Sequence, residues 1–156
     1  MNVFTFHLAE CGVAETLRAL IRTPSSRPTP GRVHAECMVP MILGHPVALP
    51  WRYRPQQIAV FAAWHSEDAV DDFLRSCRLG CALAMGWHVR MEFVRRWGHI
   101  SEFDGLPRTA RELDDDQPVV AVTLARLRVS QALRFMRWGR PVEDQVRDDP
   151  ATTISL

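Results

Sequence analysis

Apolar and polar residues alternate most strictly in the stretch WHVRMEFVRRWG at 87–98. From His88 to Phe93 every second residue is apolar, which is typical of a strand with two unlike faces. One face then carries three polar side chains, His88, Arg90 and Glu92. The pattern predicts a strand over about 88–96 and raises the question of what its polar face does.

The rest of the chain alternates between strand and helix patterns. Strands are predicted at 3–9, 32–38 and 58–64, the last of them apolar on both faces. Helices are predicted at 13–22 and 67–77, with a further helix or turn at 78–86. The core-facing stripe expected on the first helix is Val13, Leu17, Leu20 and Ile21, and on the second Val70, Phe73, Leu74 and Cys77. Proline-rich loops are predicted at 23–31 and 40–55.

The opening strand and helix occur a second time near the end of the chain. Residues 2–22 align with 118–138, so that Val3 pairs with Val119, Leu8 with Leu124 and Leu17 with Leu133. The spacing predicts a tandem repeat of a β-α-β-β-α-β, ferredoxin-like module within an α+β fold. The first module then spans 1–110, an acidic linker spans 111–117, and 118–156 is the start of a second, incomplete module that opens with a strand.

A ferredoxin-like module has helices on one face of its sheet only, and bulky apolar side chains are expected on that face. The set expected to meet the helices is Phe4, Phe6, Leu8, Val89, Met91 and Phe93. The set expected on the opposite face is Val3, Thr5, His7, His88, Arg90 and Glu92. The first and fourth strands are neighbours in this topology, so His7 should lie beside the polar trio. The sheet face that carries His7 and the polar trio is either exposed to water, as in many antiparallel sheets, or lines a cavity between two modules.

Composition and charge narrow the function classes. The chain has 156 residues and 47% hydrophobic content, enough for a compact core, and its 19 basic and 18 acidic residues nearly cancel. A basic field for nucleic acid is therefore not expected. The chain shows neither a basic leader nor about 18 consecutive apolar residues, which predicts a cytoplasmic protein. Its four cysteines form no dense framework and are expected to be reduced thiols.

Three stretches resemble one family of enzymes. They are RYRPQQIAVFAAWHSEDAVDDFL at 52–74, GWHVRMEFVRRWGHISEFDGLP at 86–107 and QPVVAVTLARLRVSQALRFMRWGRPVEDQV at 117–146. In order and character they are similar to spheroidene monooxygenase and its bacterial relatives. The resemblance covers the front part of a typical member, whose second repeat would continue past the position of Leu156. It implies a dimeric α/β-barrel and haem-dependent, O₂-dependent oxygenation of acyclic carotenoids.

On this hypothesis the polar sheet face would hold the cofactor. His88 or His7 would ligate the haem iron, Arg90 would pair with a propionate, and Glu92 would lie with them. No short motif identifies a catalytic residue. The implied partners are a small hydrophobic substrate, an electron donor, a peripheral membrane contact and a second copy of the chain.

The alternative is a non-catalytic relative that binds a small molecule or assembles with itself. A half-finished second repeat favours it, because an unpaired strand-helix unit exposes edges that another chain could cover. The remaining candidates are weaker: His34 has an uncertain phase, and His65 and His99 belong to loops. Cys77 and Cys81, four residues apart, lack the tighter pairing of a structural zinc site.

Overall fold

The computed structural model describes residues 3–22, 29–45, 49–99, 101–112, 116–124 and 128–150. The chain divides into two compact units, one of Met1–Val39 and Pro55–Asp115, the other of Pro40–Arg54 and Asp116–Leu156. The proline-rich segment 40–54 thus groups with the C-terminal residues. No helix among the described residues is long and apolar enough to cross a membrane.

The first unit contains a four-stranded antiparallel sheet with the order β2-β3-β1-β4. Its strands are β1 (Val3–Glu10), β2 (Arg32–Met38), β3 (Gln57–Trp64) and β4 (Trp87–Glu92). The predicted α+β class and the predicted neighbours β1 and β4 are confirmed. Strand β4 is shorter than predicted, and beyond it Arg95 forms only an isolated bridge with Thr109.

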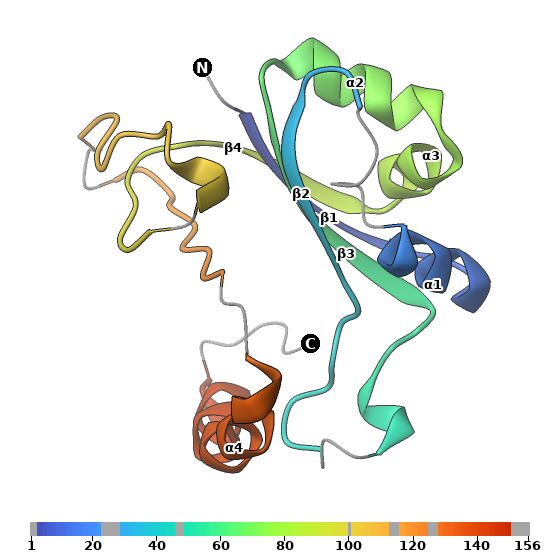
Figure 1. The fold of residues 1–156 in the computed structure, drawn as a ribbon, viewed down its shortest axis with the longest axis vertical. Helices are drawn as coiled ribbons and strands as arrows, with labels where there is room; N and C mark the ends of the chain where they lie inside the picture. Colours follow the sequence, from blue (N-terminus) through green and yellow to red (C-terminus); the bar gives the residue numbers. More distant parts are fainter. Residues whose placement is uncertain are drawn as a thin grey trace. The chain divides into compact units, whose positions relative to one another are not determined.

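Three helices lie on one face of this sheet (Figure 1). They are α1 (Val13–Ile21), α2 (Glu67–Ser76) and α3 (Arg78–Met85). Ser66 caps α2, its Oγ accepting from the Ala69 amide at 3.3 Å. The helix α2 buries Val70, Phe73 and Leu74, whereas Cys77 is exposed and caps α3 instead, its sulfur accepting from the Gly80 amide.

The side of helix α1 that is buried differs from the predicted one. It buries Thr16 and Ala19, while Val13, Leu17 and Ile21 are 41%, 50% and 81% exposed. The expected core-facing stripe is therefore wrong for these three residues. Small side chains face the sheet, which brings the helix backbone close to it and leaves the larger apolar stripe outside.

The predicted assignment of the two sheet faces is also wrong. Trp64 at the end of β3 is 1% exposed and packs on Phe73 of α2 with a ring separation of 5.1 Å. Because Trp64 is the cross-strand partner of Val3, alternate residues of β1 share its face. The residues of β1 and β4 on the helix-covered face are Val3, Thr5, His7, Ala9, His88, Arg90 and Glu92.

The face free of helices consequently carries the bulky apolar side chains. Phe4 packs against Phe61, Phe93 and Phe103 at ring separations of 5.8, 6.0 and 5.7 Å. Phe103 belongs to the 3-10 helix Ser101–Phe103, which follows β4 in the chain and covers this part of the face. The rest of the face is partly uncovered, with four half-buried residues, Phe6, Leu8, Val89 and Met91, and the exposed Trp87.

Two glycines let the helices approach closely on the other face. A Cβ on Gly80 would lie 2.0 Å from the Phe73 carbonyl oxygen, at the join of α2 and α3. A Cβ on Gly86 would lie 2.3 Å from the Leu8 carbonyl oxygen and 2.8 Å from Ala9 Cβ. Small residues are therefore required where the α3-β4 turn crosses β1.

The second unit consists of the segment 40–54 and a long helix, α4 (Ala132–Asp148), preceded by a 3-10 turn at Val129–Gln131. The repeat predicts a helix over 129–138, and α4 begins within this range but continues to Asp148. The strand predicted from residue 118 is absent, because residues 116–124 have no regular structure, and Val119 and Val120 are 64% and 65% exposed.

A buried ion pair connects the loop to the helix. Arg52 is 3% exposed, and its Nη2 donates to Glu143 Oε1 at 2.6 Å, while its Nη1 donates to the His45 carbonyl. The Gly44 amide donates to the other oxygen of Glu143 at 3.2 Å. Both carboxylate oxygens of Glu143 are thus used to fix the loop against α4.

Glycine-to-alanine substitutions test the close approaches. We expect Gly86→Ala and Gly80→Ala each to lower the free energy of unfolding by about 1–3 kcal/mol, because backbone must move to accept the new Cβ. Gly105→Ala is the matched control, since nothing lies within 4 Å of its added Cβ, and it should change stability by less than about 0.5 kcal/mol. Urea unfolding measures all three, and equal effects would contradict the packing described here.

Neutralising the half-buried Glu143 carboxylate tests the ion pair. Glu143→Gln leaves the Arg52 guanidinium buried without a counter-charge, so we expect a loss of about 3 kcal/mol in the stability of α4. Hydrogen exchange of the α4 amides measures this directly. Asp144→Asn, which removes an exposed partner of Arg147, is the control and should leave the exchange rates nearly unchanged. Unchanged protection in Glu143→Gln would contradict a stabilising role for the pair.

Candidate functional site

The two histidines of the predicted site do meet. His7 and His88 are cross-strand partners, and their rings stack with a centroid separation of 5.3 Å and an interplanar angle of 22°. His88 is exposed at the sheet edge, and its Nδ1 lies 3.4 Å from the Gly86 carbonyl oxygen. The predicted neighbourhood is correct, but it lies under the helices.

His7 is the most unusual polar residue of the sheet. It is 1% exposed, and neither ring nitrogen has a hydrogen-bond partner of normal geometry among the described residues. Burial, reinforced by the nearby His88, lowers the pKa of His7 to about 4, and a weak backbone interaction with Leu83 acts in the opposite direction. The imidazole is therefore neutral at physiological pH and belongs to the packed core.

Arg90 is already committed to carboxylates of the neighbouring helix. Its two terminal nitrogens donate to Glu67 and Asp71 of α2. These hydrogen bonds raise the pKa of Arg90, and the bond from Arg90 lowers the pKa of Asp71. Glu92 is exposed, with Arg111 Nη1 at 3.7 Å. Arg90 therefore ties the edge strand β4 to α2 and does not present its guanidinium to a ligand.

Two of the candidate haem residues are engaged in the fold itself. The candidate iron ligand His7 lies between sheet and helices, with Val60 of β3 as its other cross-strand partner, and the candidate propionate partner Arg90 has two carboxylates of its own. Within the described ranges, no group of three or more His, Cys, Asp or Glu side chains is placed to hold a metal ion. Haem ligation by His7 or His88 stays a prediction from the resemblance.

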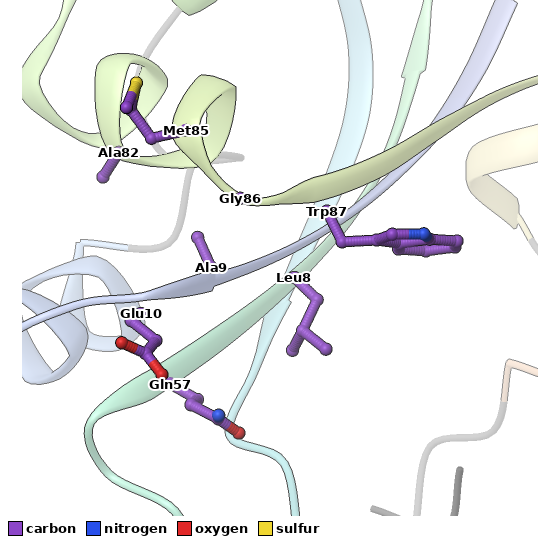
Figure 2. Close-up of a pocket in the computed structure, with 8 residues that line it drawn as sticks. All are labelled: Leu8, Ala9, Glu10, Gln57, Ala82, Met85, Gly86 and Trp87. Carbon is purple, nitrogen blue, oxygen red and sulfur yellow. The ribbon is translucent and has the colours of Figure 1, made fainter. Parts of the chain in front are cut away.

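A shallow hollow lies at the end of the sheet where α3 turns into β4 (Figure 2). Its lining residues are Leu8, Ala9, Glu10, Gln57, Ala82, Met85, Gly86 and Trp87. Figure 2 shows Leu8 and Trp87 pointing together to one side of β1 and Ala9 toward α3. None of the four predicted site residues lines this hollow. Its polar groups, Glu10 and Gln57, do not form a recognisable acid-base pair.

The sequence leaves the phase of His34 open, and the structure places it on the helix-free face. Its Nε2 lies 2.9 Å from Glu36 Oε1, and its ring meets the edge of Phe103 at 5.3 Å. His34 pairs with Ala63, which shares the face of Phe4 and Phe61. The spacing of His34 and Glu36, two residues apart on a strand, is the signal that could have identified this pair.

The other candidates lie at separate places on the surface. His65 is exposed at the end of β3, and His99 pairs with Asp104 at 3.0 Å in the segment after β4. Cys77 and Cys81 are exposed free thiols, while burial raises the pKa of the Cys37 thiol to about 12. The structure does not bring any of these residues together with His7 or His88.

Comparison of the chain with known proteins yields no relative: no family model, no curated protein and no solved structure matches it. The candidate site must therefore be judged by its geometry. The four polar residues lie on the helix-covered side of the sheet. The partly exposed apolar residues of the opposite face, Phe6, Leu8, Trp87, Val89 and Met91, have no covering element of the first unit among the described residues.

Acid should destabilise the fold through His7. Because the pKa is lowered from 6.5 to about 4 in the folded state, the unfolded chain binds a proton more readily between these values. The contribution of neutral His7 to the free energy of unfolding is complete above pH 6.5 and is lost as the pH falls toward 4. The loss is about 3 kcal/mol for the whole pKa shift and about 2 kcal/mol between pH 7 and pH 5.

The comparison that isolates His7 is urea unfolding of the wild type and His7→Leu at pH 7 and pH 5. The variant should lose about 2 kcal/mol less than the wild type over this interval. The exposed His65 provides the control, and His65→Leu should keep the wild-type pH dependence. Identical pH dependence in the wild type and His7→Leu would show that His7 is not held neutral by burial.

Proposed function

We propose that this chain is a self-associating, ferredoxin-like protein that buries the helix-free face of its sheet against the same face of a second copy. The topology supports the proposal, because the strand order β2-β3-β1-β4 and the element order of the first unit are those of a β-α-β-β-α-β module with one divided helix. Paired sheets of this kind would form a dimeric α/β-barrel.

The observation that carries the proposal is the apolar character of the helix-free face. An antiparallel sheet with one face open to water normally alternates apolar and polar residues. Here the polar row lies on the side of the helices, and the open face carries Trp87, Val89 and Met91 on β4 beside Leu8 and Phe6 on β1. Trp87 is 61% exposed although its ring contacts Phe6. Such a surface is typical of an interface.

The second copy is the occupant that symmetry favours. A two-fold axis brings the same patch of two chains together, so a continuous apolar row needs no other complementary surface. The hydrophilic groups of the face lie on β2, where His34 and Glu36 pair with each other, and at the end of the sheet, where Glu10 of β1 lies opposite Gln57 of β3. The middle of the face and its β4 side can therefore be buried while the Glu10 carboxylate stays at the rim of the contact.

Sedimentation velocity over a range of concentrations tests this function. The wild type should form a dimer, and Trp87→Glu should weaken dimerisation at least about 30-fold, because a charge replaces an exposed aromatic anchor at no cost to the core. Met91→Glu should act in the same direction. Leu17→Glu on the exposed side of α1 is the matched control and should dimerise normally.

Circular dichroism establishes that each variant is folded. A wild type that is monomeric at all concentrations would overturn the proposal, and so would a dimer that Leu17→Glu weakens and Trp87→Glu does not. A monomer that solubilises an acyclic polyene, and loses this ability in Trp87→Glu, would assign the face to a hydrophobic ligand instead.

A further inference from the structure

The exposed apolar stripe of α4 is a second unpartnered surface. Phe135, Trp138, Val142 and Val146 are 62%, 72%, 58% and 44% exposed. Their spacing of three, four and four residues places them on one side of the helix. Glu143, which is fixed by Arg52, lies beside this stripe, so the ion pair holds the helix in place while the stripe stays uncovered.

We infer that α4 pairs in antiparallel orientation with α4 of a second copy, forming a two-fold symmetric helix pair. This contact is separate from the sheet face and does not depend on the function proposed above, and where one dimer makes both contacts, a charge placed in either of them weakens that dimer. Three observations support it: the charge distribution along α4, the shape of the stripe, and the residues that flank it.

The charge distribution along α4 suits an isolated helix only in part, through Arg147 in its last turn. Its first turn contains no acidic residue, and Arg134 lies there, whereas Glu143, Asp144 and Asp148 lie in its second half. Basic groups near the N-terminus and acidic groups near the C-terminus oppose the helix dipole. An antiparallel partner compensates for both, because it brings its acidic end beside the basic end of the first helix.

The stripe also has the shape that a partner helix requires. A hollow at its N-terminal end is lined by Gln131, Arg134, Phe135 and Trp138. These residues are spaced i, i+3, i+4 and i+7, which is the four-residue hole that accepts a side chain in a coiled coil. In the antiparallel register that centres the stripe on itself, Val146 of the partner lies opposite this hole and Val142 lies opposite Trp138. Gly139 adds no side chain near the crossing point.

The same register brings opposite charges together at the edges of the contact. Arg134 is exposed beside Phe135, and Asp148 is exposed two residues after Val146, at the other end of the stripe. In an antiparallel pair these two positions face each other, and symmetry repeats the pair at the other end. Asp148 already accepts from Arg147 of its own helix at 2.9 Å, so a second cation would complete a small charge network.

Sedimentation velocity of the full chain tests the apolar part of the contact. Trp138→Glu should weaken self-association at least about 30-fold. Trp97→Glu is the matched control, because Trp97 is 81% exposed on the first unit, and it should leave self-association unchanged. Loss of helix stability in Trp138→Glu without any change in mass would show that the stripe is covered within one chain, and it would overturn the inference.

Charge exchange tests the antiparallel register. Arg134→Glu and Asp148→Arg should each weaken the dimer, by about 5-fold, and the double variant should recover most of the loss. Arg134→Glu should at the same time increase the helicity of the dissociated chain, because an acidic residue in the first turn suits the helix dipole. Lack of recovery in the double variant would contradict the register.

The two contacts can be separated by their variants. If Trp138→Glu has no effect and Trp87→Glu dissociates the protein, the α4 inference fails and the sheet proposal stands. If Trp138→Glu dissociates it and Trp87→Glu has no effect, the helix pair is the dimer contact and the sheet proposal fails.

Discussion

The burial of Trp64 between the sheet and α2 determines most of the first unit. The indole is almost completely enclosed, and its Nε1 donates to Thr5 Oγ1 at 2.9 Å, which satisfies the one polar group of the largest side chain in the core. Because side chains alternate along a strand, this contact sets the phase of β1, and through β1 that of β4. His7 and Arg90 are thereby turned toward the helices, and Phe6 and Met91 away from them.

The consequence is an inverted amphipathic sheet. On the helix-covered face Thr5 accepts from Trp64 and Arg90 binds Glu67 and Asp71, whereas His7 is buried in its neutral form without a hydrogen bond of normal geometry among the described residues. The open face is mostly apolar, and only part of it is covered by Phe93 and Phe103 of the segment after β4. A sheet that hides its polar row and shows its apolar row gains from association with another apolar surface. The proposed self-association rests on this phase, which also places His7 in the core between sheet and helices.

Much of the fold can be predicted from local pattern. Gly12, the proline-rich loops and the Ser66 cap mark element boundaries, and the strand neighbours follow from the topology of the module. Side-chain size does not reveal which face of the sheet the helices cover, because small residues form the contacts between helices and sheet. Gly86 lies against Leu8 and Ala9, and α1 faces the sheet with Thr16 and Ala19. In β1 both alternations, Val3-Thr5-His7 and Phe4-Phe6-Leu8, are compatible with a buried face.

The strand predicted at 118 also fails, since a β pattern without a neighbouring strand has no hydrogen-bond partners. The pair of Arg52 and Glu143 joins residues 91 positions apart, and no local pattern indicates it.

The central claim is that the apolar face of the sheet contacts the same face of another chain. Isotope-filtered nuclear Overhauser measurements on an equal mixture of labelled and unlabelled protein test this contact at the atomic level. The methyl group of Met91 and the ring of Phe6 in one chain should show cross-peaks to Trp87 and Leu8 of the other. A mixture in which these residues show cross-peaks only within their own chain, at concentrations where the protein is fully associated, would contradict the account.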